Sequence, residues 1–212
     1  MFDDRFYKIT LPGGTVVEGP SVTTLLSVIR LPGVEWWRGE LGNEEAERVL
    51  NEAGELGSDM HKLLARYNRG EKVRAPRDPQ LNKMFRAHKE WSEAWVRQVI
   101  EVEYEVRSVK YQYGGTVDLV ALLKGERKPA IIDYKTGRVY RTHHFQTAGY
   151  LRAYEEQTGI KAGRRIVIHL DKHDPGTLTP IDGTDPEDDQ AFLCAMFLWR
   201  KLRGGKLNVQ AA

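Results

Sequence analysis

The sequence is poor in cysteine and has no long hydrophobic run. Cys194 is the single cysteine among 212 residues, which excludes an internal disulfide, a four-cysteine zinc site and a cysteine-ligated iron–sulfur cluster. No run approaches the roughly 18 apolar residues that a membrane-spanning helix needs. The first residues also lack the basic start and apolar stretch of a secretory signal. We therefore expect a soluble, cytoplasmic protein with no membrane partner.

Charge of one sign is also scarce. The 32 Lys and Arg residues nearly balance the 30 Asp and Glu residues, which gives a net charge of +2. This balance excludes a strongly basic nucleic-acid coat but permits a local basic groove. Hydrophobic residues make up 41% of the chain, enough to bury a core and to exclude a disordered tail. The length favours one domain over residues 1–212.

The hydrophobic patterns divide this domain into three parts. Residues 1–97 are predicted to be mostly helical after a short hairpin at 6–18, with a helix capped by Ser21 and helices over about 43–67 and 79–97. The first of these two longer helices is expected to bend or break near Gly54 and Gly57. Residues 98–182 form the sheet core, and residues 183–212 form a C-terminal helix and tail.

Alternation marks the start of the sheet core. Glu101, Glu103 and Glu105 alternate with apolar residues in the segment 99–106, so we expect the three carboxylates to face solvent on one side of a strand. Nearly continuous apolar strands follow at 116–123 and 129–135, then a helix over about 143–157 and strands at 164–170 and 177–181. This order predicts an α/β fold with a mixed central sheet flanked by helices.

The hairpin formed by residues 114–137 carries the chemistry. A two-residue turn centred on Gly125 and Glu126 pairs Leu119 with Ile132. In that register Asp118 stands directly opposite Asp133, and Lys135 follows on the same face. Both faces of the two strands are apolar, so we expect the strands in the middle of the sheet.

Two facing carboxylates destabilise a sheet unless something compensates their charge. At about 5 Å they repel by roughly 3 kcal/mol at an effective dielectric near 20, whereas a favourable cross-strand pair contributes only about 0.2–1 kcal/mol. A shared proton, a basic side chain or a divalent cation relieves the repulsion. A cation held beside a lysine suits phosphodiester hydrolysis, because it polarises the phosphate and acidifies a bound water. An ordinary Asp–Lys ion pair is the alternative that the hairpin alone leaves open.

Ordered motifs add a family resemblance. Three segments resemble motifs of the RecB-like branch of the PD-(D/E)xK nucleases: GTVDLV (115–120), IIDYKTG (131–137) and QTAGY (146–150). Upstream, GSDMH (57–61) resembles the helical histidine motif of that branch. The segment PSVTT (20–24) is similar to an N-terminal segment of phage-type exonucleases and of the mitochondrial genome maintenance exonuclease. The resemblance implies a restriction-endonuclease-like αβββαβ core and metal-dependent cleavage of DNA, often at ends or in single strands.

The resemblance also implies roles for individual residues. His61, Asp118 and Asp133, with the backbone carbonyl of Tyr134, are the expected ligands of Mg²⁺ or Mn²⁺, and Lys135 is the expected catalytic lysine. Gln146 and Tyr150 share a helix face and are expected to line the site and position the strand. Taken alone, His61 would be a partly exposed helical histidine, and Gln146 and Tyr150 part of an ordinary amphipathic helix. One departure from many relatives is that no iron–sulfur cluster can form.

Further residues are candidates for contact with DNA. Hydroxyls near helix termini and basic side chains beside the proposed site can bind phosphate, and these candidates are Ser58, Thr23, Thr24, Arg138, Arg141 and His144. The alternatives are that the hydroxyls serve helix caps and that the basic residues belong to a solvated loop. Glu105 is expected to be a solvated surface residue.

These observations favour a metal-dependent deoxyribonuclease, bacterial or phage-encoded, that acts in DNA repair or recombination as an exonuclease or flap-processing nuclease on single-stranded ends. One alternative is a non-catalytic nucleic-acid-binding or adaptor domain that retains the nuclease fold. A second is a structural domain in which Asp118, Asp133 and Lys135 form a closed ion-pair cluster.

Overall fold

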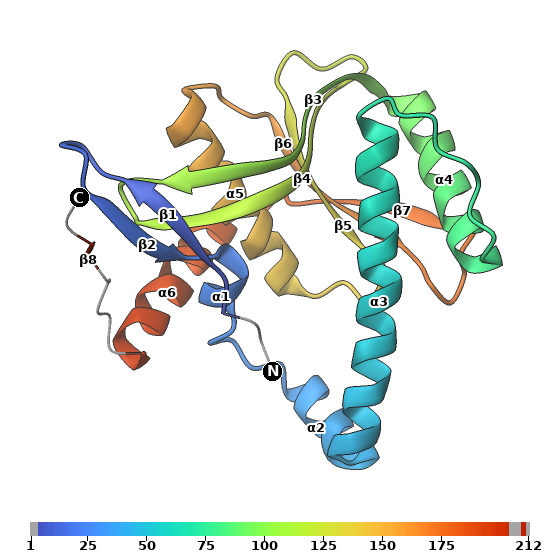
Figure 1. The fold of residues 1–212 in the computed structure, drawn as a ribbon, viewed down its shortest axis with the longest axis horizontal. Coiled ribbons are helices and arrows are strands. Elements are labelled where there is room, and N and C mark those ends of the chain that lie inside the picture. The colour runs from blue at the N-terminus through green and yellow to red at the C-terminus, as the bar shows by residue number, and fades with distance from the viewer. Residues whose placement is uncertain (1–3, 204–208, 211–212) are drawn as a thin grey trace.

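A five-stranded mixed sheet forms the centre of the structure, a computed structural model that describes residues 4–203 and 209–210 (Figure 1). The strands lie side by side in chain order: β3 (Val96–Ser108), β4 (Tyr113–Leu123), β5 (Ala130–Lys135), β6 (Arg164–Leu170) and β7 (Leu178–Asp182). Strands β5 and β6 run parallel, and the other neighbours are antiparallel. The combination of parallel and antiparallel pairs confirms the predicted mixed α/β fold. The strand order also confirms that β4 and β5 lie in the middle of the sheet.

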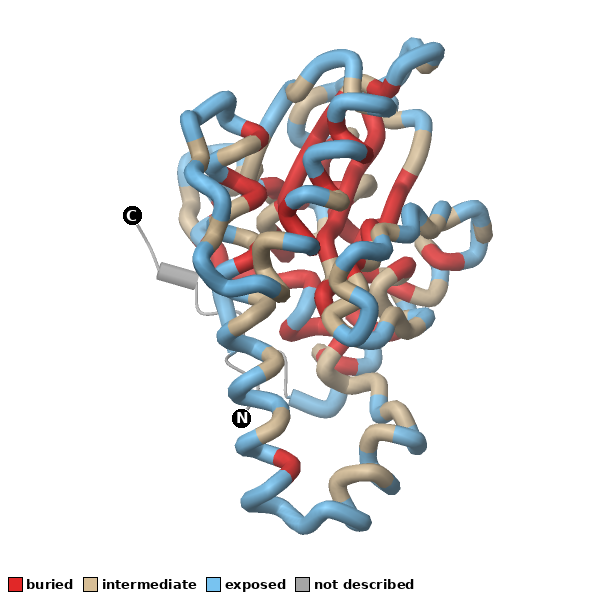
Figure 2. The backbone as a smooth tube through the Cα atoms, turned by 90° about the vertical axis from the view of Figure 1, so that its right-hand side faces the viewer, coloured by how far each residue is buried: buried red, intermediate tan, exposed pale blue. Residues whose placement is uncertain are grey.

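Helices cover both faces of the sheet. Helices α3 (Asn43–Asn68) and α4 (Pro79–Trp95) bury Leu119 and Ile132 on one face. Helices α1 (Val22–Leu26), α5 (Arg141–Thr158) and α6 (Glu187–Leu202) bury Val120 and Ile131 on the other. The two apolar faces read from the sequence therefore each contact a separate core, and Figure 2 shows the central strands as the most buried part of the backbone.

A small sheet packs beside the central one. Strands β1 (Phe6–Thr10) and β2 (Val16–Pro20) form the predicted hairpin, and β2 also pairs with β8 (Val209–Gln210). Ser21 then caps α1, because its Oγ accepts a hydrogen bond from the backbone N–H of Thr24 at 2.9 Å. The hairpin and its cap thus place the start of α1 next to β4, where Ser21 bridges to Gly114.

Helix α3 is continuous over 26 residues, so the predicted break near Gly54 and Gly57 is wrong. Gly57 instead permits a close approach: a Cβ there would lie 3.2 Å from Oγ1 of Thr136, just after β5. The N-terminal part of α3 extends away from the sheet together with α2 (Pro32–Leu41), and most of this arm is exposed (Figures 1 and 2). Among residues 43–59 only Ala46 is buried.

Strand β3 does not keep the predicted alternation. Its pairing with β4 shifts register between Val96 and Gln98 and again between Val99 and Glu101, and Glu103 has a positive φ of 52°. Pairing of Val102 with Leu119 and of Tyr104 with Val117 brackets Glu103 and sets it across from Asp118. The prediction that Glu103 faces solvent beside Glu101 and Glu105 is therefore wrong.

None of the helices in the described part of the chain has the length and hydrophobicity needed to cross a bilayer. The end of the predicted C-terminal tail lies partly outside the described residues, which resume only for β8.

Candidate active site

The candidate site lies where β4 and β5 diverge. Leu119 pairs with Ile132 and Ala121 with Ala130, which confirms the predicted register, although the turn itself closes between Leu123 and Glu126. Within the described residues the pairing of β4 with β5 ends at Leu119 and Ile132, one residue before Asp118 and Asp133. Oδ2 of Asp118 instead accepts the backbone N–H of Tyr134 at 2.7 Å. The carboxylate thereby replaces a ladder carbonyl, and both aspartates line one cleft of about 1000 Å³.

His61 reaches this cleft from α3. Its Nδ1 lies 3.3 Å from Oδ1 of Asp118, and its Nε2 lies 3.1 Å from the backbone carbonyl of Tyr134. Burial alone would lower the pKa of His61, but the Asp118 carboxylate more than offsets burial and raises that pKa to about 9. Burial would likewise raise the pKa of Asp118, and the charge and hydrogen bond of His61 outweigh it, so that pKa is lowered. At neutral pH the two side chains form a hydrogen-bonded ion pair.

Asp133 is held by a lysine and an amide. Nζ of Lys135 lies 2.6 Å from Oδ2 of Asp133, and Nε2 of Gln146 donates to Oδ1 at 3.0 Å. Nε2 of Gln146 also lies 2.9 Å from the Tyr150 hydroxyl. Asp133 is only 1% exposed, and burial raises its pKa to about 6, with Lys135 opposing and Asp118 adding to that rise. Lys135 and Gln146 thus meet at the Asp133 carboxylate, and Tyr150 is linked to it through Gln146.

Glu103 is a member of the site that the sequence did not reveal. Ligand-type atoms of His61, Glu103 and Asp118 all lie within 4.8 Å of one another. Burial, and then the Asp118 charge, raises the pKa of Glu103. The period-two pattern placed its carboxylate on the solvent side, and only the pairing of residues 96–108 with residues 113–123 reverses that placement.

The donor set fits a hard divalent cation. Carboxylate oxygens, a backbone carbonyl and one imidazole suit Mg²⁺ and Mn²⁺ better than softer metals. Three carboxylates (Glu103, Asp118 and Asp133) face two cationic side chains, His61 and Lys135, so negative charge is in excess. Loss of the His61 proton would increase this excess and free an imidazole nitrogen for a metal.

The predicted DNA contacts divide into two groups. Ser58 and Thr23 line the cleft, together with Arg5. Thr24 is buried instead, where its Oγ1 accepts from the Arg5 backbone N–H at 3.0 Å and from Oγ of Ser21 at 2.8 Å. Its hydroxyl therefore serves the cap of α1, which corrects the expectation that Thr24 contacts DNA.

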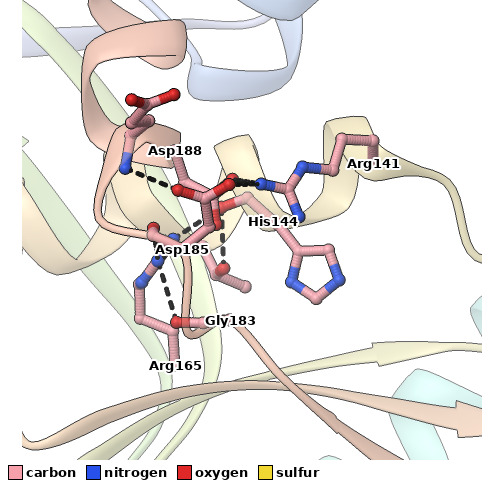
Figure 3. Close-up of polar contacts among 8 residues, drawn as sticks. Arg141, His144, Arg165, Gly183, Asp185 and Asp188 are labelled. Atoms are coloured by element: carbon pink, nitrogen blue, oxygen red, sulfur yellow. Dashed lines mark hydrogen bonds and ion pairs between the residues drawn. The ribbon is translucent and has the colours of Figure 1, made fainter.

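Arg141 and His144 lie in the first turn of α5, not in a solvated loop before it, and both belong to a polar cluster (Figure 3). Arg141 forms ion pairs with Asp185 and, at 2.8 Å, with the fully buried Asp188. His144 is buried, and its backbone carbonyl accepts a hydrogen bond from Arg165 at 3.0 Å. The imidazole of His144 is thus covered and cannot reach a DNA backbone. The Arg141 side chain is 54% exposed in spite of its ion pairs, so its contact with DNA stays a prediction.

This polar cluster fixes α5 to the start of α6. Arg165 also pairs with Asp188 at 3.0 Å and donates to the carbonyl of Gly183 at 2.9 Å (Figure 3). Helix α5 carries Gln146 and Tyr150, so the cluster holds in place the helix that presents them. Arg138 is exposed, with its guanidinium 5.6 Å from the centre of the Tyr140 ring, and it does not line the cleft.

The protein is thus an α/β protein with an acidic cleft that can bind a cation. Carboxylates, an imidazole and a lysine converge in this cleft, where two strands of the mixed sheet diverge. A sequence profile of the PD-(D/E)XK nuclease superfamily matches residues 77–211. The match spans more than half of the chain, and the protein belongs to this superfamily. Its members are nucleases, and the superfamily implies a divalent metal and a nucleic-acid substrate.

Two solved structures are similar to this chain at low identity. The protein SSO0001 shares 17% identity with a TM-score of 0.43, over 84% of this chain and 75% of its own. A candidate exonuclease from Eubacterium rectale shares 12% identity with a TM-score of 0.48, over 76% of this chain and 70% of its own. No curated protein was found to match the sequence. The superfamily assignment therefore depends on the profile match and not on these structures.

Proposed function

We propose that the protein is a divalent-metal-dependent deoxyribonuclease of the RecB-like branch that acts on single-stranded ends or flaps. The observation that carries the proposal is the meeting of Asp118, Asp133, Lys135 and His61 in one cleft. These residues lie on three elements, and the divergence of β4 and β5 opens the space between them. The branch and the substrate are supported by the order of the GSDMH, GTVDLV, IIDYKTG and QTAGY motifs.

In this proposal the acidic side of the cleft holds Mg²⁺ or Mn²⁺. His61, Asp118, Asp133 and the carbonyl of Tyr134 are the ligands, and Glu103 adds a further carboxylate. When bound, the cation polarises the phosphate and lowers the pKa of a bound water. His61 and Lys135 neutralise the buried Asp118 and Asp133, and the further carboxylate of Glu103 beside Asp118 favours binding of a cation.

The remaining residues position the reacting groups. The Lys135 ammonium, 2.6 Å from Asp133, stabilises charge that develops on the phosphate oxygens and orients the attacking water. Gln146 fixes both a carboxylate oxygen of Asp133 and the Tyr150 hydroxyl. Tyr150 lines the cleft and presents that hydroxyl to the phosphate or the terminal nucleotide.

The variant Lys135→Ala tests the proposal. With an end-labelled single strand and Mn²⁺, its cleavage rate should fall by about 10²–10³-fold, the usual cost of removing one transition-state donor. Folding and DNA binding should persist, as measured by thermal unfolding and fluorescence anisotropy. Lys128→Ala, at the far end of the same hairpin, is the matched control and should cleave like the wild type. Unchanged cleavage by Lys135→Ala would overturn the assignment.

Substrate form is tested separately. A nuclease that requires an end should cut linear single strands and flaps with Mn²⁺, stop on addition of chelator, and spare circular single strands. Rapid cutting of circles would contradict the end-dependent part of the proposal and would leave an endonuclease.

A further inference from the structure

Positive charge is concentrated in the segment from the last part of α3 through most of α4. Residues 62–89 contain nine Lys or Arg and two Asp or Glu, a net charge of +7 in a chain whose total is +2. The preceding residues 43–59 contain six Asp or Glu and one Arg. The dipole of α3 explains basic residues in its last turn, but it does not extend to the loop of residues 70–78, where Lys72, Arg74 and Arg77 lie. This concentration therefore needs another explanation.

Several residues between 59 and 81 line a second hollow of about 480 Å³, which we name the basic groove. Its floor includes Leu63, Val73 and Leu81, half-buried side chains that pack on the core below. Its rim carries four basic residues, Lys62, Arg66, Lys72 and Arg74, and one carboxylate, Asp59. Lys62 and Arg66 also line the catalytic cleft, so the groove begins where the cleft ends.

Two of the four basic rim residues form ion pairs with carboxylates, and the other two do not. Lys62 lies 3.4 Å from Asp59, and Arg66 pairs with Glu71 at 2.8 Å. Among the residues that the structure describes, Lys72 and Arg74 have no carboxylate partner, and both are exposed. Their charges are free to meet those of a ligand.

We propose that the basic groove binds unpaired nucleotides of the substrate strand, next to the phosphate that is cut. The inference deepens the proposed function and depends on it for the position of the cut. Positively charged grooves follow the phosphates of a single strand, and the half-buried Leu63, Val73 and Leu81 form an apolar floor that unstacked bases can contact. A duplex keeps its base faces stacked inside and cannot use such a floor, so the chemistry selects single strands.

Charge also sets the direction of the strand. The acidic part of α3 repels phosphates, and the basic end attracts them. The bound strand therefore leaves the cleft past Lys62 and Arg66 toward the loop that carries Lys72 and Arg74, away from the arm formed by α2 and the start of α3.

The double variant Lys72→Glu/Arg74→Glu tests the groove, with Arg127→Glu/Lys128→Glu on the distant β4–β5 turn as the matched control. Binding of labelled oligothymidylates of increasing length is measured by anisotropy in chelator, over a range of salt concentrations. For long single strands the groove variant should bind at least about tenfold more weakly, with a salt slope reduced by about 1.4, the value for two lost contacts to single-stranded phosphates. Short oligonucleotides that fill only the cleft should bind equally well to the variant and the wild type.

Each other result has a defined meaning. Equal losses in both double variants, no loss in the groove variant, or an equal loss for duplex DNA would overturn the groove assignment. If the wild type cleaves, the groove variant should raise KM for long strands and leave kcat unchanged, and a fall in kcat alone would count against the groove. Groove-dependent binding without any metal-dependent cleavage would support the groove as a binding site and refute the nuclease proposal.

Discussion

The two aspartates of the cleft have different surroundings although they come from neighbouring strands. Asp118 meets a protonated His61 and a backbone N–H, and its pKa is lowered. Asp133 is more deeply buried, and its pKa is raised to about 6 in spite of Lys135. In the absence of metal the two cationic side chains therefore neutralise the two aspartates, as the closed ion-pair alternative requires. Glu103 is the third carboxylate of the cleft, and this closed cluster provides no cationic side chain to neutralise it.

Glu103→Gln should weaken Mn²⁺ binding by at least about tenfold, because the charge of the ligand set governs the affinity of such sites. Glu105→Gln is the matched control, two residues along the same strand and paired with Arg107 outside the cleft. Isothermal titration with Mn²⁺ measures both variants. Equal affinities for the two would remove Glu103 from the metal site.

At the scale of elements, the sequence predicts those features of the helices and strands that depend only on neighbouring residues. The register of β4 and β5, and with it the meeting of Asp118 and Asp133, follows from two doubly apolar strands. The predicted two-residue turn at Gly125 and Glu126 is wrong, because the backbone N–H of Glu126 donates to the carbonyl of Leu123 and a longer loop joins the paired residues. The orientation of Glu103 depends on two bulges in β3 and a positive φ, which no hydrophobic period indicates. The continuity of α3 depends on packing of Met60 and Leu64 against the sheet, which overrides the poor helix propensity of two glycines.

His88 links three elements through a buried polar chain. On α4 its Nε2 lies 3.3 Å from Oδ1 of Asn68, at the end of α3, and Nδ2 of Asn68 donates to the hydroxyl of Tyr134 on β5 at 3.1 Å. Burial lowers the pKa of His88 to about 3, and the rings around it belong to Tyr67, Trp91 and Tyr134. A folded chain with His88 neutral thus binds one proton fewer than the unfolded chain between about pH 3 and pH 6.5.

Stability should accordingly fall as the pH drops below about 6.5. For His88 alone, the free energy of unfolding should decrease by about 2 kcal/mol between pH 7 and pH 5, at 1.36 kcal/mol per unit of pKa difference. His88→Gln should be less stable at pH 7 but should lack this part of the pH dependence. Urea unfolding at both pH values measures it, and identical pH dependence in the two proteins would refute the burial of a neutral imidazole.

At the scale of the whole molecule, charge is separated along one helix. The arm is acidic and carries exposed apolar side chains such as Trp36 and Leu41, whereas residues 62–89 are basic. The fold class follows from the hydrophobic pattern, and the single-domain organisation stays a prediction. The basic groove could not be predicted, because residues 59–81 form one surface only after α3, the loop and α4 pack together.

The central claim is that the acidic cleft is a divalent-metal site and not a closed ion-pair cluster. Thermal unfolding in Mn²⁺ and in chelator, for the wild type and Asp118→Asn, tests it most directly. Saturation at 100 times the Kd adds about 2.7 kcal/mol, which should raise the Tm of the wild type by roughly 5–10 °C and leave Asp118→Asn nearly unchanged. A wild-type Tm that is the same in Mn²⁺ and in chelator would contradict the claim.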